Sequence, residues 1–497
     1  MRGNVYLNLR ARARGTVKHN GELQFRQYQS ANYNGDRAAM NHPEKPAHAG
    51  AEGTRPPRLT CWYVLVMMCL VYTLSIADRY VISTVLEPIR KELGLSDFMV
   101  NMAAGLPLAI FYLAFGFPLS WLIDRGNRRN IVAASLLAWS VMTMLCGKAR
   151  SALHFSLARI GVGIGEAGGT PGANSILSDY FPAALRPMAL TVFSLGAPLG
   201  AWLAAQYAGQ VADGHGWAAR AASTYAGTHG WRSVFIVLGA PGVLVGLLIY
   251  LTVKEPKRGQ LDRSTDKTAP SLRETFRFLW SQKSAINLML ASAITAFWGW
   301  GLMWFTPTFL QRTYGMSPGE AGDVTGPMHL YGGIGATLFT SWLIARPWFN
   351  DPRRIVWLLG AGIGLATIPS IVVYFTHSLP LAKAMLWIFI PAIYFYIGPC
   401  FGLLNNLAPP QMRALFCAST LLVANLGNLI LAPAFGGILS DVFAGAFGWQ
   451  PSGAQALRLA LLCLAPAGFW ATYHYFTCTR TMLKDQERAT GIGISQT

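Results

Sequence analysis

The chain has 497 residues, of which 53% are hydrophobic and only 12% charged, and its formal net charge is +18. A typical soluble domain has about 25% charged residues, so the composition excludes an ordinary soluble protein. Apolar runs long enough to cross a bilayer recur along most of the chain. We therefore predict an all-α polytopic membrane protein, whose positive charge is a matter of topology and does not indicate a nucleic-acid partner.

The cysteines and polar clusters indicate no chemistry of their own. The seven cysteines form no C-x-x-C pair, so neither a zinc site nor a disulfide framework is indicated. No nucleophile, metal-ligand set or pair of acids is clustered as a membrane enzyme would require. We expect a protein that is not an enzyme and that holds no metal and no cofactor.

Twelve apolar spans divide into two sets of six. Residues 1–60 are polar and are predicted to be a disordered cytoplasmic tail, in which Met40 is an alternative start. The first half, 61–253, has predicted spans at 62–83, 98–123, 131–149, 152–176, 188–211 and 234–253. A charged, helix-breaking linker follows at 254–284. The second half, 285–480, has predicted spans at 285–310, 324–345, 355–375, 384–404, 414–438 and 456–478, and a cytoplasmic tail occupies 481–497.

Lysine and arginine indicate the orientation of the spans. Most of the 40 lie in the tails, in the central linker and in the loops after even-numbered spans. This bias is typical of cytoplasmic segments. We predict a multi-pass protein of a plasma or inner membrane with both termini cytoplasmic.

An internal repeat relates the two halves. The segment SWLIDRGNRR at 120–129 returns as SWLIARPWFNDPRR at 341–354, each time between the second and third spans of a half. Parallel six-helix repeats are a transporter architecture with the substrate site at the interface of the repeats.

The fourth span carries two isolated charges in a glycine-rich run. The segment RIGVGIGEAGGTPGANSILSD at 159–179 holds Arg159 and Glu166 two helical turns apart. An ionisable residue at bilayer depth is costly and usually faces a partner or a water-filled cavity, although a buried structural ion pair is the alternative. GIGEAG matches G-x-G-x-x-G but lacks the strand that a dinucleotide site needs. We expect these glycines to let helices approach closely.

The two halves and the 120–129 loop resemble the major facilitator superfamily. The loop between helices 2 and 3 of that family has the approximate pattern G-x-L-x-D-R-x-G-R-R, and here Ser120 and Asn127 replace its glycines. The resemblance implies that the loop latches the cytoplasmic ends of the halves. The cytoplasmic gate predicted from it and from the loop after the fourth span consists of Asp124, Arg125, Arg128, Arg129, Asp179 and Arg186. Asp441 is predicted to act at the outer side.

Four further stretches resemble the Spinster subfamily. They are ADRYVISTVLEPIRKELGLSD, RIGVGIGEAG, GLMWFTPTFLQRTYGMS and NLGNLILAPAFGGILSD. The resemblance implies transport by alternating access, and a link to lysophospholipids or sphingoid lipids.

The charged residues of the first half are the predicted coupling site. We expect Asp78, near the outward end of the first span, to lie at a similar depth to Arg159 and to form with it a switchable ion pair; a static brace is the alternative. Glu166 is the predicted main protonation site, because burial and a nearby arginine act on a carboxyl group in opposite directions. Arg79 is expected to extend to the outer interface.

Aromatic and amide residues are the candidate substrate cavity. They are Trp300, Trp304, Asn405, Asn406, Asn425 and Asn428. Interfacial or core packing of the tryptophans, and interhelical hydrogen bonds of the asparagines, are the alternatives. His329 is expected to be a satisfied buried residue.

The sequence as a whole predicts a secondary active transporter. Its partners are expected to be membrane lipids, a small amphipathic or anionic organic solute that could be lysolipid-like, and protons. Proton symport of a small organic or sugar acid is a second interpretation. A transporter-like membrane sensor without turnover is a third.

Overall fold

The backbone of this chain is helical because a segment inside lipid must satisfy its own hydrogen bonds. The computed structural model describes residues 57–182, 185–257, 272–409 and 412–490, and these contain helices and no strand. They belong to the unit Pro56–Thr497. Apart from its last four residues, the tail predicted at 1–60 lies outside the described residues, as does 258–271 of the linker.

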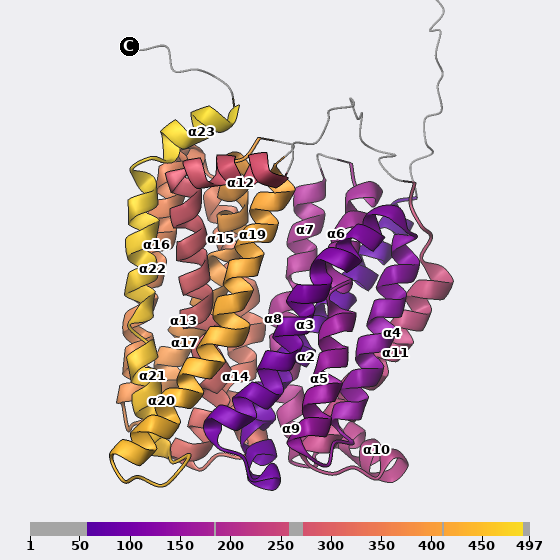
Figure 1. Cartoon of the computed structure of the whole chain (residues 1–497), viewed down its shortest axis with the longest axis vertical. Coiled ribbons are helices and arrows are strands. Elements are labelled where there is room, and N and C mark those ends of the chain that lie inside the picture. Colours follow the sequence, from indigo (N-terminus) through magenta and orange to yellow (C-terminus); the bar gives the residue numbers. More distant parts are fainter. Residues whose placement is uncertain (1–56, 183–184, 258–271, 410–411, 491–497) are drawn as a thin grey trace, which may run out of the picture. The chain divides into compact units, whose positions relative to one another are not determined.

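The first half contains six passes from one end of the bundle to the other. Its helices are α2 (Arg58–Leu93), α3 (Asp97–Arg125), α4 (Arg128–Cys146), α5 (Ala152–Glu166), α6 (Gly169–Tyr180), α7 (Arg186–Ser194), α8 (Gly196–Trp202), the π-helical η1 (Leu203–Tyr207), α9 (Ala208–Ala212), α10 (Gly216–Ala226) and α11 (Trp231–Thr252). Helices α5 and α6 form one interrupted pass, and α7 to α9 form another (Figure 1).

The second half repeats this arrangement. Its helices are α12 (Leu272–Ser281), α13 (Lys283–Tyr314), α14 (Pro318–Pro327), the π-helical η2 (Met328–Gly333), α15 (Ile334–Ile344), the short 3₁₀ turn η3 (Pro347–Asn350), α16 (Pro352–Phe375), α17 (Leu379–Phe395), α18 (Ile397–Asn406), α19 (Arg413–Asn425), the π-helical η4 (Leu426–Leu431), α20 (Ala432–Ala446), α21 (Ala454–Leu464), α22 (Ala467–Thr479) and α23 (Met482–Thr490).

Ten helices of the described residues are long and apolar enough to cross a membrane. The passes α5–α6 and α14–η2–α15 complete the predicted twelve, and the fold class is confirmed. Two differences from the predicted boundaries bear on the site and on the surface. Helix α2 continues ten residues beyond its predicted end, and the linker, predicted to be helix-breaking, contains α12.

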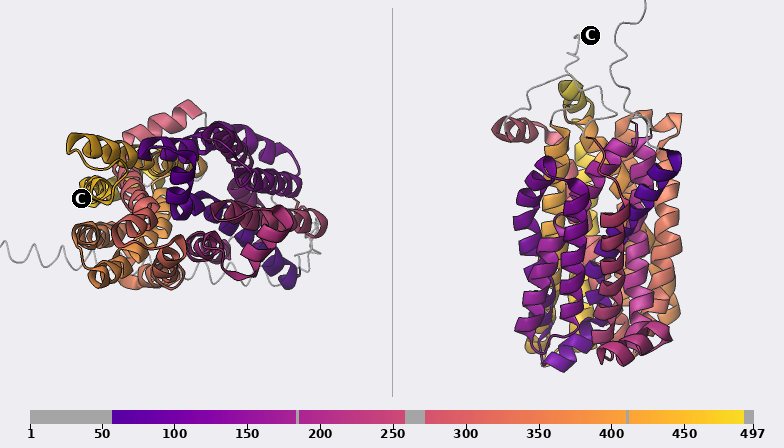
Figure 2. Two further views of the ribbon diagram at one scale, coloured as in Figure 1. Left: turned by 90° about the horizontal axis from the view of Figure 1, so that it is seen from below. Right: turned by 90° about the vertical axis from the view of Figure 1, so that its right-hand side faces the viewer.

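The two ends of the bundle differ. At the end that we call the linker end, α12 lies crosswise to the other helices at the edge of the bundle and α23 extends beyond them, as Figures 1 and 2 show. At the opposite end, which we call the hairpin end, α10 and the turn between α2 and α3 lie.

Polar contacts join the two halves at mid-depth and toward the hairpin end. Arg312 of α13 forms ion pairs with Glu87 of α2 and Asp97 of α3, at 2.7 and 2.6 Å. The Asp441 carboxylate of α20 accepts the backbone N–H groups of Asp97 and Phe98, at 3.2 and 2.9 Å, and so caps the first turn of α3. Such a cap satisfies helix N–H groups that have no partner within the helix.

Glycines bring the two halves into backbone contact beside these polar groups. A Cβ atom on Gly322 of α14 would lie 2.2 Å from the Ala205 carbonyl of η1, and one on Gly209 would lie 2.5 Å from the Pro318 carbonyl. Close approach of backbones through small residues is a common way for membrane helices to pack. The three π-helical segments of the described residues each contact the opposite half, η1 with α14, η2 with α8 and η4 with α3.

Candidate functional site

Four charged side chains are buried together at mid-depth in the first half. Arg79 donates its Nε hydrogen to Oε2 of Glu166 across 2.6 Å, and Arg159 Nη1 lies 3.8 Å from Oδ1 of Asp78. The four residues are between 1% and 8% exposed. Neighbouring residues of α2 are thus paired with two residues of α5 that lie two turns apart, and the cluster is neutral when all four are ionised.

The two pairs differ in how completely they are satisfied. Arg159 also donates to the carbonyls of Ala104 and Asp78, at 3.0 and 3.4 Å, and the Arg79 guanidinium lies 4.3 Å from the centre of the Tyr112 ring. Both carboxylate oxygens of Asp78, and Oε1 of Glu166, accept no hydrogen bond from the described residues. The guanidinium groups of the site therefore each have more than one partner, whereas the carboxylates have oxygens without a hydrogen bond from the described residues.

The local sequence explains why Glu166 lies where the helix is interrupted. It is the last residue of α5, and the pass resumes at Gly169 as α6. A Cβ on Gly163 would lie 2.4 Å from the Leu108 carbonyl, and one on Gly165 would lie 2.7 Å from Trp139 Cβ, so the glycines let α5 pack against α3 and α4. This close approach is the role predicted for them.

Two expectations about α2 are wrong. Arg79 does not extend to an interface, because its side chain is 10% exposed and paired with Glu166. Asp78 does not lie near the end of its helix, because α2 continues to Leu93, about 22 Å further along its axis. The part of α2 after residue 83 buries Val85, Leu86 and Ile89. Glu87 in the same segment forms ion pairs with Arg312 and Arg90.

Tyr80 connects the charge cluster to the second half. It follows Arg79 on α2, and its ring stacks on Trp300 of α13 with centroids 4.8 Å apart. Its hydroxyl accepts a hydrogen bond from Asn428 Nδ2 of η4 at 2.9 Å. Trp304 donates its indole N–H to Asn101 Oδ1 at 2.7 Å, which is a further contact between the halves.

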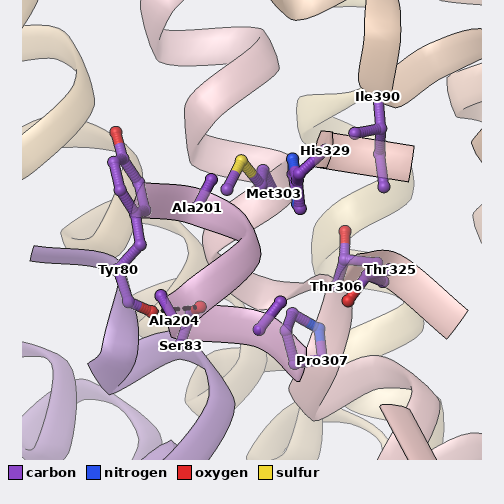
Figure 3. Close-up of a pocket in the computed structure, with 11 residues that line it drawn as sticks. Tyr80, Ser83, Ala201, Ala204, Met303, Thr306, Pro307, Thr325, His329 and Ile390 are labelled. Carbon is purple, nitrogen blue, oxygen red and sulfur yellow. Dashed lines mark hydrogen bonds between the residues drawn. The ribbon is translucent and has the colours of Figure 1, made fainter. Parts of the chain in front are cut away.

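A small cavity lies beside Tyr80, between the halves (Figure 3). Tyr80 and Ser83 line it from α2, and Met303 and Thr306 line it from α13. His329 of η2 also lines it, and its Nδ1 lies 3.0 Å from the Tyr394 hydroxyl. The lining is a mixture of apolar groups, hydroxyls and one imidazole.

The other predicted cavity residues lie elsewhere. Asn405 and Asn406 end α18 at the linker end, where Asn406 is exposed, and Asn425 is half-buried at the end of α19. Of the six candidates, Trp300, Trp304 and Asn428 meet around Tyr80. Tyr80 was not among the predicted site residues, although its position next to the charged Arg79 in an apolar span could have indicated it.

The predicted gate residues form a cluster at the linker end of the first half. Arg128 donates to Asp179 at 2.5 Å, to Glu255 at 2.8 Å and to the Pro256 carbonyl at 2.8 Å. Arg129 donates its backbone N–H to Glu255 at 2.8 Å. The partners belong to the first half and to the start of the linker, so these contacts join α4, α6 and the chain after α11. The latch between halves that the resemblance implied stays a prediction.

The remaining gate residues make more local contacts. Arg186 Nε donates to the carbonyls of Ser178 and Phe181, at 2.8 and 3.0 Å. The Arg125 guanidinium lies 4.3 Å from the centre of the Trp121 ring. The side chain of Asp124 lies outside what the structure describes. Glu255, which binds the neighbouring Arg128 and Arg129, was not among the predicted gate residues. Its position directly after the sixth span, as an acidic residue, could have indicated it.

Comparisons with known proteins, by sequence and by structure, indicate the same family. The sequence profile described as Major Facilitator Superfamily matches residues 68–432. The chain is similar to the crystal structure of a bacterial homologue of the human lysosomal transporter Spinster, in an inward-facing and unoccupied conformation. The TM-score is 0.75 at 32% sequence identity, over 86% of this chain and 99% of that one.

Two curated relatives are similar over different lengths. An MFS-type efflux pump of Mycolicibacterium smegmatis is 30% identical over 430 residues, which are 84% of this chain and 92% of the relative. A probable galactarate/D-glucarate transporter of Bacillus subtilis is 28% identical over 314 residues, which are 56% of this chain and 63% of the relative.

Proposed function

The chain belongs to the major facilitator superfamily and is a Spinster-like membrane transporter, and from this premise we propose that it couples the movement of protons to that of a small amphipathic or anionic organic solute. Transport occurs by alternating access, with the substrate between the halves. The linker end is the cytoplasmic end in this proposal. The arrangement described here, with halves in contact at the hairpin end, is then the inward-facing state.

One observation carries the coupling part of the proposal. Arg79 and Glu166 form a buried ion pair at 2.6 Å, while the second oxygen of Glu166 accepts no hydrogen bond from any residue that the structure describes. A buried pair is stable only while both partners are charged. A proton on the free oxygen would neutralise Glu166 and leave the Arg79 charge without a full partner.

The position of Arg79 connects this protonation to the substrate. Its neighbour Tyr80 contacts Trp300 and Asn428 of the second half. A proton on Glu166 would release Arg79 to attract the anionic group of a solute, while the Tyr80–Trp300 ring pair offers apolar surface. In this scheme the Asp78–Arg159 pair responds to the same change, because Asp78 is adjacent to Arg79. A membrane potential contributes about 2.3 kcal/mol per charge per 100 mV, enough for useful accumulation.

A proton symporter for a small organic or sugar acid is the second candidate. The relative named as a probable galactarate/D-glucarate transporter favours it. The efflux-pump relative and the Spinster homologue favour a more amphipathic solute. Thermal unfolding of the purified protein with lysophosphatidylcholine and with D-glucarate separates the two, because only a bound solute raises the midpoint.

Counterflow in proteoliposomes tests the function itself. Vesicles preloaded with whichever of the two solutes binds should accumulate its labelled form, and a pH gradient should drive net uptake or release. Glu166→Gln should keep exchange and lose the response to pH. Asp485→Asn is the matched control, because Asp485 is a buried carboxylate with an arginine partner at the linker end, far from the cluster. Binding without counterflow would instead identify a sensor without turnover.

A further inference from the structure

The exposed face of α12 combines two arginines with two aromatic rings. Arg273, Phe276, Arg277 and Trp280 follow the spacing i, i+3, i+4, i+7, which places them on one side of a helix. All four are exposed, and Trp280 is 70% exposed. Neither arginine forms an ion pair with a residue that the structure describes.

The opposite face of α12 is held by the second half. Thr275 and Leu279 are buried, and the Phe278 ring lies 6.2 Å from that of Phe416 in α19. The exposed face is therefore fixed in direction and is not a surface that the helix can turn inward.

The position of α12 in the chain places its exposed face near the membrane surface. Helix α13, a membrane span, begins at Lys283, two residues after α12 ends at Ser281. Figure 1 shows α12 crosswise to the other helices at the level of the linker end, and the right-hand view of Figure 2 shows it projecting from the side of the bundle at that level. A helix at the start of a span lies at the depth of the lipid headgroups, where tryptophan is enriched and arginine attracts phosphate.

We propose that the exposed face of α12 is a binding site for anionic phospholipids of the leaflet at the linker end. The two guanidinium groups bind headgroup phosphates, since a planar guanidinium matches phosphate geometry. Phe276 and Trp280 enter the boundary between headgroups and acyl chains. Through Phe278 and Phe416 the bound lipid anchors the linker end of α19.

The test uses the full-length protein in mixed micelles. The fraction of dioleoylphosphatidylglycerol is raised against dioleoylphosphatidylcholine, and bound phosphatidylglycerol is counted by native mass spectrometry. The Arg273→Gln/Arg277→Gln variant should need about 25-fold more phosphatidylglycerol for half-occupancy, since each arginine near an anionic surface contributes about 1 kcal/mol, or about fivefold. Its thermal unfolding in pure phosphatidylcholine should match that of the unmodified protein.

A charge-matched control separates a built site from general attraction. Arg480→Gln/Lys484→Gln removes two exposed positive charges from the same end without touching α12, and should shift half-occupancy by less than twofold. Equal shifts in both variants, or none in the α12 variant, would overturn the proposal. The proposal is also overturned if the α12 variant is less stable in pure phosphatidylcholine and binds phosphatidylglycerol as before, because the two arginines would then bind an acidic segment of the chain and not lipid.

Salt tests the electrostatic part of the proposal. For the unmodified protein, 0.5 M salt should weaken phosphatidylglycerol binding; no weakening contradicts the proposal.

Discussion

Arg79 of α2 donates its Nε hydrogen to Glu166 of α5 across 2.6 Å, and both side chains are buried in the first half. The pair joins two helices that have few backbone contacts, so the side chains themselves bridge the space. Removing one partner of a buried pair typically destabilises a protein by about 3–5 kcal/mol, because the remaining charge is left without compensation. The pair is thus sensitive to any change of protonation.

We expect Arg79→Gln to lower the unfolding midpoint, because Glu166 would be buried without its cation. Thermal unfolding in detergent measures this. In the Arg79→Gln/Glu166→Gln double variant part of the loss should be recovered, and a double variant as unstable as Arg79→Gln would show that the unpaired Glu166 is not the cause.

Asp78→Asn should be the milder substitution. Arg159 would keep its hydrogen bonds to the Ala104 and Asp78 carbonyls, and its ion pair with Asp78 is 3.8 Å long. We expect less than half of the loss in unfolding free energy caused by Arg79→Gln. A loss as large as that of Arg79→Gln would indicate that the pair is a structural brace.

Arg312→Gln should open the hairpin end. Arg312 forms ion pairs with both Glu87 and Asp97 of the opposite half, and its side chain is 5% exposed. In a Ser83→Cys background, which places a thiol in the small cavity beside Tyr80, a membrane-impermeant maleimide added at the hairpin side should label about tenfold faster. Arg353→Gln serves as the control, because Arg353 is exposed and paired with Asp351 at the linker end. Unchanged labelling in Arg312→Gln would exclude this ion pair as a lock.

The glycine contact between α14 and η1 gives a steric version of the same test. In Gly322→Ala the new Cβ would meet the Ala205 carbonyl at 2.2 Å, a backbone atom that cannot rotate away. We expect faster labelling of Ser83→Cys from the hairpin side and a lower unfolding midpoint. Gly335→Ala, in α15 of the same pass, has open space around its Cβ and should change neither quantity; equal effects would assign the change to helix propensity.

Arg128 and Arg125 should behave differently although they share one loop. Arg128 is 2% exposed and holds Asp179 and Glu255, so Arg128→Gln should cost several kcal/mol of unfolding free energy. Arg125 contacts only the Trp121 ring in the part of the chain that the structure describes, and Arg125→Gln should cost less than about 1 kcal/mol. Chemical unfolding of both variants measures these free energies, and similar losses of unfolding free energy in the two variants would contradict the role of Arg128 as the centre of this cluster.

The sequence by itself determined the fold class, because long apolar spans in two related sets of six have few solutions in lipid. It also identified Asp78, Arg159 and Glu166, since an isolated charge in an apolar run is conspicuous. Tertiary structure decided which charge meets which. Arg79 lies well inside α2, which continues to Leu93, and it pairs there with Glu166. The Glu87–Arg312 ion pair joins the later turns of α2 to the second half. That contact joins residues 225 positions apart, and no local pattern encodes a partner at such a distance.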